Sequence, residues 1–200
     1  MKSFLPLLAF LFISLPELSH GYYSLMNSGD LIEENKKSIL IETQYISSQP
    51  VRGANINGRF ATGLNSESEL QGEIGFGSVD FNLGGFWKWV PFPDTSSQPA
   101  VGARIGATFA KLNNVSTYGL QITPTVSKKI SLGGMGIMAP YLGLPVGLQN
   151  TNDDTFLSLQ GAFGLQYQHF NFQSLSLLIE YSFEIDDALN HFSLALSFDI

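Results

Sequence analysis

The sequence contains no cysteine, few charged residues and no cluster of basic residues. Without cysteine, the chain cannot have a disulfide framework, thiolate metal sites, a cysteine nucleophile or a lipidated N-terminal cysteine. Lysine and arginine occur singly or in pairs (Lys36-Lys37, Lys128-Lys129), and the net charge is −7. Because no basic patch is available to neutralise phosphates, we expect no nucleic-acid partner.

Charged residues make up 14% of the chain, whereas about 25% is typical of soluble proteins. Hydrophobic residues make up 44% and are spread thinly, with 20 glycines and 16 phenylalanines. A chain with so few charges can cover little surface that faces water. We therefore expect part of the surface to face another medium.

Long apolar runs are also lacking. The longest near the N-terminus, Phe4–Leu15, is about 12 residues, too short to span a bilayer as a helix. Lys2 precedes it, and the small residues Ser19 and Gly21 follow in a polar stretch. This layout is typical of a secretory signal peptide. We predict a signal peptide at 1–21, a flexible N-terminal arm at 22–37 and one folded domain at 38–200.

From residue 38 onward, apolar and polar residues alternate. In 38–47, for example, Ile39, Ile41 and Tyr45 share one face while Glu42 and Gln44 share the other. Successive side chains of a strand point to opposite faces, so this pattern predicts strands with one apolar and one polar face. Turn residues separate the segments. The same alternation recurs in 54–64, 70–76, 81–89, 101–109, 117–126, 157–167, 175–184 and 192–199.

The length and polarity of these segments distinguish a membrane barrel from a soluble one. Most are about 10 to 14 residues long, whereas globular strands have about 5 or 6 and tilted membrane-spanning strands about 9 to 11. Their polar faces are poor in charge and rich in Gly, Ser, Thr, Asn and Gln, which suits a confined interior. We predict an all-β fold: a transmembrane antiparallel up-and-down β-barrel of about ten strands, with eight or twelve as alternatives, closed because lipid tolerates no free strand edge.

The stretch from Ile130 to Leu148 allows two interpretations. It carries no charge and could be a membrane-spanning helix, but it contains many glycines together with Pro140 and Pro145. We favour a strand over its second half, although a proline inside a strand removes a ladder hydrogen bond.

Two further sets of residues follow from the predicted barrel. Aromatic residues near strand ends match the girdles that lie at the membrane interface: Tyr45, Trp87, Trp89, Tyr118, Tyr167 and Tyr181. Inward-facing charges must be paired or hydrated, because an unpaired buried charge costs several kcal/mol. They form a predicted lumen charge network: Glu42, Arg59, Glu73, Lys88, Arg104, Glu180 and Glu184.

The segment from His191 to Ile200 resembles the terminal strand that the barrel-assembly machinery recognises. Its expected outward residues are Phe192, Leu194, Leu196 and Phe198. Strands of this kind usually end on the aromatic residue, whereas here Asp199 and Ile200 follow Phe198. Together with the signal peptide, this strand resembles the small outer-membrane β-barrel proteins of Gram-negative bacteria. The resemblance implies a location in the cell outer membrane, outer-membrane lipid as surroundings and the assembly machinery as a partner during biogenesis.

Two functions remain open for such a barrel. A closed charge network would favour a structural or surface role, which we expect. A charged lining of a water-filled lumen, for which inward glycines leave space, would favour a narrow diffusion pore for ions or small solutes. No phosphate loop, zinc spacing or dinucleotide fingerprint is present, and we expect no metal and no cofactor.

A membrane-embedded hydrolase is the least favoured alternative, and we expect no enzymatic activity. His191 and Ser193 resemble the His-x-Ser pair of lipid A deacylases, but no suitable acid follows and both face inward. Omptin-like proteases use Asp and His at the outer rim, and this chain has residues of those types: Asp153, Asp154, Asp186, Asp187 and His191. Acidic turns are usually solvated hairpins.

Overall fold

The computed structural model describes residues 26, 28–49, 51–112, 115–151 and 154–200. The predicted signal peptide lies outside these residues. None of the helices among the described residues is long and apolar enough to cross a membrane.

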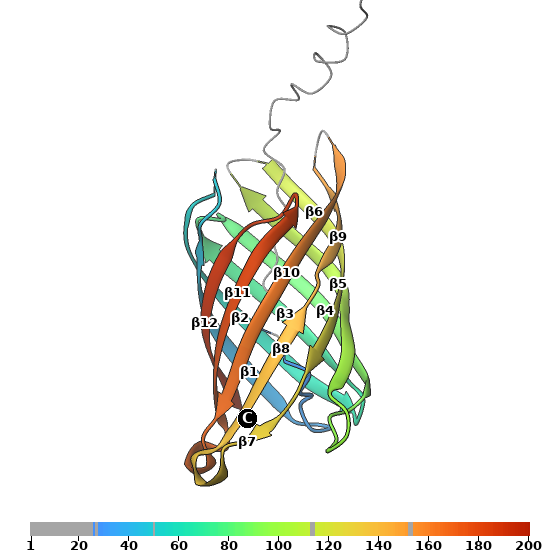
Figure 1. Ribbon diagram of the computed structural model, residues 1–200. Coiled ribbons are helices and arrows are strands. Elements are labelled where there is room, and N and C mark those ends of the chain that lie inside the picture. Colours follow the sequence, from blue (N-terminus) through green and yellow to red (C-terminus); the bar gives the residue numbers. More distant parts are fainter. Residues whose placement is uncertain (1–25, 27, 50, 113–114, 152–153) are drawn as a thin grey trace, which may run out of the picture.

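The described chain is almost entirely β-structure, wound into an elongated barrel of tilted strands (Figure 1). Its elements, in chain order, are β1 (Lys37–Ile46), β2 (Gly53–Asn65), β3 (Ser68–Gly77), β4 (Phe81–Phe92), β5 (Ala100–Leu112), β6 (Val115–Ser127), β7 (Ile130–Ser131), η1 (Gly133–Met135), β8 (Ile137–Gly143), β9 (Val146–Asn150), β10 (Thr155–Gln168), η2 (Phe170–Phe172), β11 (Leu175–Asp186) and β12 (His191–Asp199).

The sheet closes because β1 pairs with β12 as well as with β2, antiparallel in both cases. β8 and β9 together fill one position between β6 and β10, since each of them pairs with both neighbours. The two-residue β7 pairs with β8 outside this ring. The prediction of a closed antiparallel barrel of ten strands is therefore confirmed, and the alternatives of eight and twelve are excluded.

The stretch that allowed two interpretations contains strands, not a membrane-spanning helix. It is divided between β8 and β9, with the break at Leu144 and Pro145. Leu144 donates its backbone N–H to the carbonyl of Pro124, and Gln160 donates to the carbonyl of Pro145. On the other side of β10, its ladder with β11 shifts register between Leu159 and Gln160. Because proline lacks an N–H, the ladder cannot continue regularly through this point.

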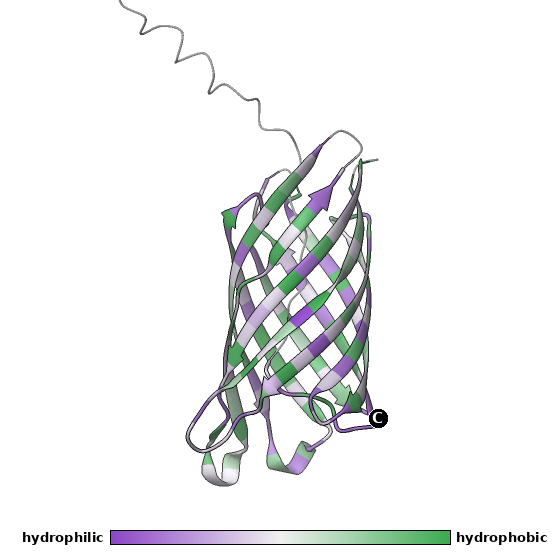
Figure 2. Ribbon diagram, turned by 90° about the vertical axis from the view of Figure 1, so that its right-hand side faces the viewer, coloured by the Kyte–Doolittle hydropathy of each residue, from purple (hydrophilic) through white to green (hydrophobic). Residues whose placement is uncertain are grey.

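Burial is inverted relative to a water-soluble protein. Along β1 the exposed residues are the apolar Ile39, Ile41 and Tyr45, while Glu42 and Gln44 are completely buried. Figure 2 shows the resulting alternation of hydrophobic and hydrophilic residues along every visible strand. A continuous apolar exterior of this size is unstable in water but matches the hydrocarbon of a bilayer. The chain is a membrane β-barrel.

The two ends of the barrel differ. We call the end at which β1 begins and β12 ends the terminal rim, and the other the opposite rim. The terminal rim carries the longer connections, 93–99, 128–136 and 169–174, and the opposite rim carries 47–52, 78–80 and 187–190. Figure 1 shows β7 and the adjoining connections below the barrel wall at the terminal rim.

Candidate functional site

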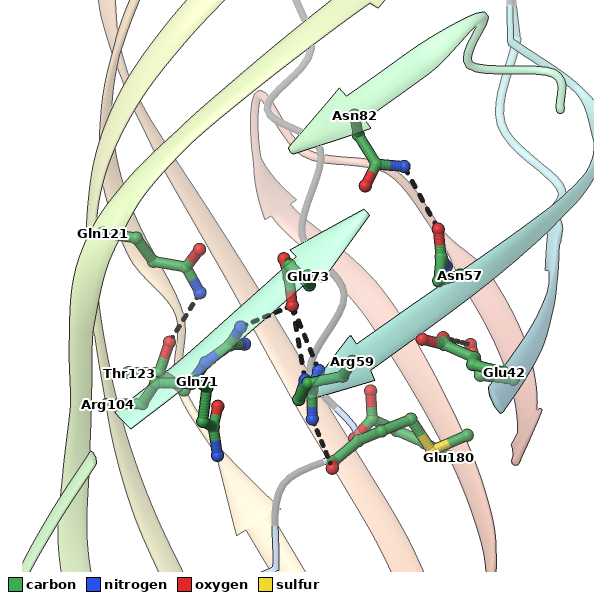
Figure 3. Close-up of polar contacts among 12 residues, drawn as sticks. Glu42, Asn57, Arg59, Gln71, Glu73, Asn82, Arg104, Gln121, Thr123 and Glu180 are labelled. Carbon is green, nitrogen blue, oxygen red and sulfur yellow. Dashed lines mark hydrogen bonds and ion pairs between the residues drawn. The ribbon is translucent and has the colours of Figure 1, made fainter. Parts of the chain in front are cut away.

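The lumen is the candidate functional site, because the polar face of every barrel strand converges there. At its centre, Glu73 of β3 accepts hydrogen bonds from two arginines. Arg104 Nη2 lies 2.6 Å from Glu73 Oε2, and Arg59 Nη2 lies 3.3 Å from the same oxygen. Figure 3 shows both side chains pointing at this carboxylate. The three groups are almost fully buried, so each charge depends on the others for the stabilisation that water would otherwise give.

The inward glycines do not leave an open channel around this cluster. A Cβ atom at Gly84 would lie 2.8 Å from Glu73 Cγ, and one at Gly106 would collide with the ring of Phe86. Gly75 likewise makes room for the amide side chains of Asn57 and Asn82, which hydrogen-bond to each other. The space beside these glycines is thus filled by neighbouring side chains.

A second ion pair lies closer to the terminal rim. Lys88 Nζ is 3.4 Å from Glu69 Oε1, and the two residues are directly opposite on β4 and β3. Lys88 also donates to the backbone carbonyl of Asp30, and Asp30 Oδ1 lies 2.9 Å from Lys129 Nζ. These contacts fix the segment before β1 against the wall.

Of the described residues before β1, Met26 and 28–32 lie inside the barrel, whereas 33–36 are exposed. The guanidinium of Arg59 donates to the carbonyl of Met26 at 2.9 Å, Gly29 donates its N–H to Ser127 Oγ at 2.9 Å, and Ile32 donates to Glu69 Oε2 at 2.8 Å. Met26 packs with Leu40, Leu178 and Ala195. We name Met26 together with 28–32 the lumen segment. The sequence predicted a flexible arm at 22–37, and in the structure this part of it contacts the wall on several sides.

Acidic residues of the opposite wall are held by hydroxyl donors. Ser193 Oγ donates to Glu42 Oε1 at 2.6 Å, and Tyr141 Oη donates to Glu180 Oε2 at 2.8 Å. His191 Nε2 lies 3.9 Å from Glu180 Oε1. All five side chains are buried, so this cluster belongs to the polar interior.

An apolar cluster lies in the lumen towards the opposite rim. Ile46, Val51, Val79 and Leu189 form a buried cluster, against which Ala110 and Leu112 pack. Val51 and Val79 come from the connections of this rim, so these connections fold inward over the lumen.

Six of the seven charges predicted for the lumen lie there: Glu42, Arg59, Glu73, Lys88, Arg104 and Glu180. Glu184 is exposed near the opposite rim, where its side chain accepts from Asn190 Nδ2 at 3.4 Å. Sequence reasoning missed Glu69, although extending the alternation back from Glu73 and Gln71 would have found it. It also missed Phe86, whose inward position follows from the outward positions of Trp87 and Trp89.

The predicted exterior residues have the following positions. Five of the six predicted interface aromatics are 40–56% exposed: Tyr45, Trp87, Trp89, Tyr118 and Tyr181. The rings of Trp87 and Trp89 stack, with 6.0 Å between their centroids. Tyr167 is half-buried and donates its hydroxyl to the carbonyl of Met135 at 2.7 Å. The residues of the predicted assembly signal all point outward from β12: Phe192, Leu194, Leu196 and Phe198.

The described residues considered for hydrolysis lie in two different places. His191 and Ser193 face the buried lumen, whereas Asp154, Asp186 and Asp187 are exposed near the opposite rim. Asp153 lies outside the described residues. Within the part of the chain that the structure describes, no group of three or more His, Asp or Glu side chains could hold a metal ion.

No protein-family model matches this sequence, and no curated protein matches it. Similar solved structures include a designed transmembrane β-barrel (12% identity, TM-score 0.42, covering 84% of this chain and 98% of that one). Another is an outer-membrane channel from Pseudomonas putida F1 (8%, 0.45, 86% and 97%). A third is Ail, the attachment invasion locus protein of Yersinia pestis (13%, 0.29, 84% and 99%).

Proposed function

We propose that this chain is an integral outer-membrane β-barrel protein with a closed lumen and a structural or surface role, and that it is neither a pore nor an enzyme. The observation that carries the proposal is the position of Glu73 of β3, which binds Arg59 on the adjacent β2 and Arg104 on β5 in the buried interior. Separating the partners of a buried ion cluster is strongly unfavourable, so these groups stay paired. A conducting pore instead needs charged groups that face water.

Three features support closure over the whole length of the barrel. The lumen segment narrows the part near the terminal rim, the arginine–glutamate cluster lies at the centre, and an apolar cluster lies near the opposite rim: Ile46, Val51, Val79 and Leu189. Each would have to move before a solute could pass.

We place the protein in the outer membrane because closed β-barrels are the β-structures that span membranes, and those of bacteria lie in the outer membrane. The apolar outward face of β12 is a suitable substrate for barrel-assembly machinery. Density-gradient separation of inner and outer membranes tests the location, and recovery with the inner membrane or in the soluble fraction would contradict it.

Single-channel recording in a planar bilayer tests the closed lumen. A heat-dependent gel shift first establishes that the purified protein is folded. We expect folded protein to give no discrete conductance steps. Steps of reproducible size from folded protein would contradict the proposal and identify a narrow diffusion pore.

A further inference from the structure

Two adjoining hollows lie near the terminal rim. The inner one is a cavity of about 220 Å³ between the lumen segment and the wall. The outer one is a groove of about 580 Å³ at the mouth of the barrel. Glu33, Lys36, Gln168 and Asp199 line both, so the inner cavity opens to the rim through the groove.

The inner cavity is polar and contains an unused hydrogen-bond acceptor. Gln71 lines it and is 7% exposed. Its Nε2 donates to Glu69 Oε1 at 2.6 Å, but its Oε1 has no hydrogen-bond partner among the described residues. A buried acceptor without a donor is destabilising. A ligand with an N–H or O–H donor would satisfy Gln71 Oε1.

The charges that line this cavity are balanced. Its lining includes four positive side chains, Lys36, Arg59, Lys88 and Lys129, and four negative ones, Asp30, Glu33, Glu69 and Asp199. A ligand with a net charge would leave an uncompensated charge in a partly desolvated space. Three of these positive groups pair with three of the negative ones, as in Lys36–Glu33 at 2.7 Å. A zwitterion adds no net charge to this balance.

The mouth adds an apolar surface to this polar cavity. Ile137, Phe170 and Ile200 line the outer groove, and Phe170 and Ile200 are 41% and 65% exposed. They stand at the ends of β8, β10 and β12, whose outward residues form the lipid-facing exterior. The apolar side of the groove thus lies beside the ends of strands whose outward residues face lipid.

We propose that these hollows bind a single-chain amphiphile with a zwitterionic head group, of the lysophosphatidylethanolamine class. The head group occupies the inner cavity, its ammonium donates to Gln71 Oε1, and the acyl chain leaves over Phe170 towards the surrounding lipid. This inference goes beyond the proposed function, because the site is entered from the rim and requires no passage through the barrel.

The head-group site is tested with Gln71→Leu and a matched control, Gln121→Leu. Gln121 is also a buried lumen glutamine with an unpartnered Oε1, but it does not line the cavity. Binding of lysophosphatidylethanolamine, below its micelle concentration, to protein held in amphipol is followed by native mass spectrometry and calorimetry. We expect saturable binding at one site, about tenfold weaker in Gln71→Leu and unchanged in Gln121→Leu.

The mouth is tested with a second matched pair, Phe170→Ser and Phe172→Ser. Both phenylalanines belong to η2 and are exposed, but only Phe170 lines the groove. We expect only Phe170→Ser to weaken binding.

A fluorescent reporter tests the path of the acyl chain. The chain has two tryptophans, so Phe170→Trp in a Trp87→Phe/Trp89→Phe background leaves one tryptophan, at the mouth. A lysolipid brominated on its acyl chain should quench the fluorescence of this tryptophan.

Three results would overturn the inference in variants whose gel shift shows that they are folded. The first is the absence of saturable binding to the unmodified protein. The second is an equal effect of the two substitutions within either matched pair. The third is equal affinity for the anionic lysophosphatidylglycerol, which would show that the balanced charges do not select the head group. Conductance reports separately on the proposed function.

Discussion

The guanidinium of Arg104 lies over the ring of Phe86, with 3.3 Å between Cζ and the ring centroid. Arg104 is completely buried, so the ring replaces part of the hydration that the cation has lost. We expect Phe86→Leu to lower the free energy of unfolding by about 1–2 kcal/mol, measured by urea unfolding in lipid vesicles. Phe76→Leu, at an exposed position, is the control, and a loss of the same size there would contradict the prediction.

Glu73→Gln should destabilise the barrel more strongly. The substitution leaves Arg59 and Arg104 buried near each other without the carboxylate that they share. Breaking a buried ion pair on one side costs about 3–5 kcal/mol. The same urea titration measures the loss. Glu184→Gln, at an exposed site, should stay within about 0.5 kcal/mol of the unmodified protein, and similar values for the two variants would argue against a central ion cluster.

Gly29→Val should release the lumen segment from the wall. A Cβ at residue 29 would collide with Ser127 Oγ and lie 2.9 Å from Ala100 Cβ. Because the chain has no cysteine, Ser28→Cys provides a single thiol for maleimide labelling. We expect slow labelling of this buried position and faster labelling once Gly29→Val is added. Ser97→Cys, on an exposed connection, should react rapidly in both backgrounds; equal rates at position 28 would contradict the prediction.

The connection between β4 and β5 should be sensitive to acid. Burial alone would raise the pKa of Asp94, but hydrogen bonds from Lys128 Nζ and the Lys129 N–H, both at 2.7 Å, and the charges of these lysines lower it below its ordinary 3.8. A carboxylate whose pKa is lowered on folding stabilises the protein above the unfolded pKa, and this contribution disappears as pH falls through the folded pKa.

We therefore expect Asp94→Asn to be less stable than the unmodified protein at neutral pH, by no more than about 1 kcal/mol because Lys128 is partly exposed. The difference should vanish when the pH is taken below the folded pKa. Urea titrations of both proteins across this range measure it. A difference that is independent of pH would show that the carboxylate charge is not responsible.

Leu120→Arg should impair membrane insertion. Leu120 is 65% exposed on the outward face of β6, and an arginine at the bilayer midplane of a barrel costs about 2–4 kcal/mol. The folded fraction in vesicles, read from the gel shift, should fall. Gln98→Arg, on a rim connection, should fold normally; normal folding of Leu120→Arg would mean that this face does not contact lipid.

The sequence predicts the barrel well because alternation is a local property. Ile39, Glu42 and their neighbours show their faces without reference to any other strand. The interior arrangement depends on strand tilt and height, which alternation does not encode. The alternation along β11 places Glu184 on the inward face, yet this residue is exposed because it lies near the rim. The lumen segment has no periodicity at all, so contacts such as that between Arg59 and Met26 could not be predicted.

The pairing of β1 with β12 has a consequence for the order of events during folding. This ladder joins the two strands that are farthest apart in the sequence, and such contacts form late because of the entropy of bringing distant segments together. The segment held by Arg59, Ser127 and Glu69 lies inside the ring that this ladder completes. The sheet can therefore curl around a segment that is already bound, and the interior acts as a template on which the last pair of strands meets.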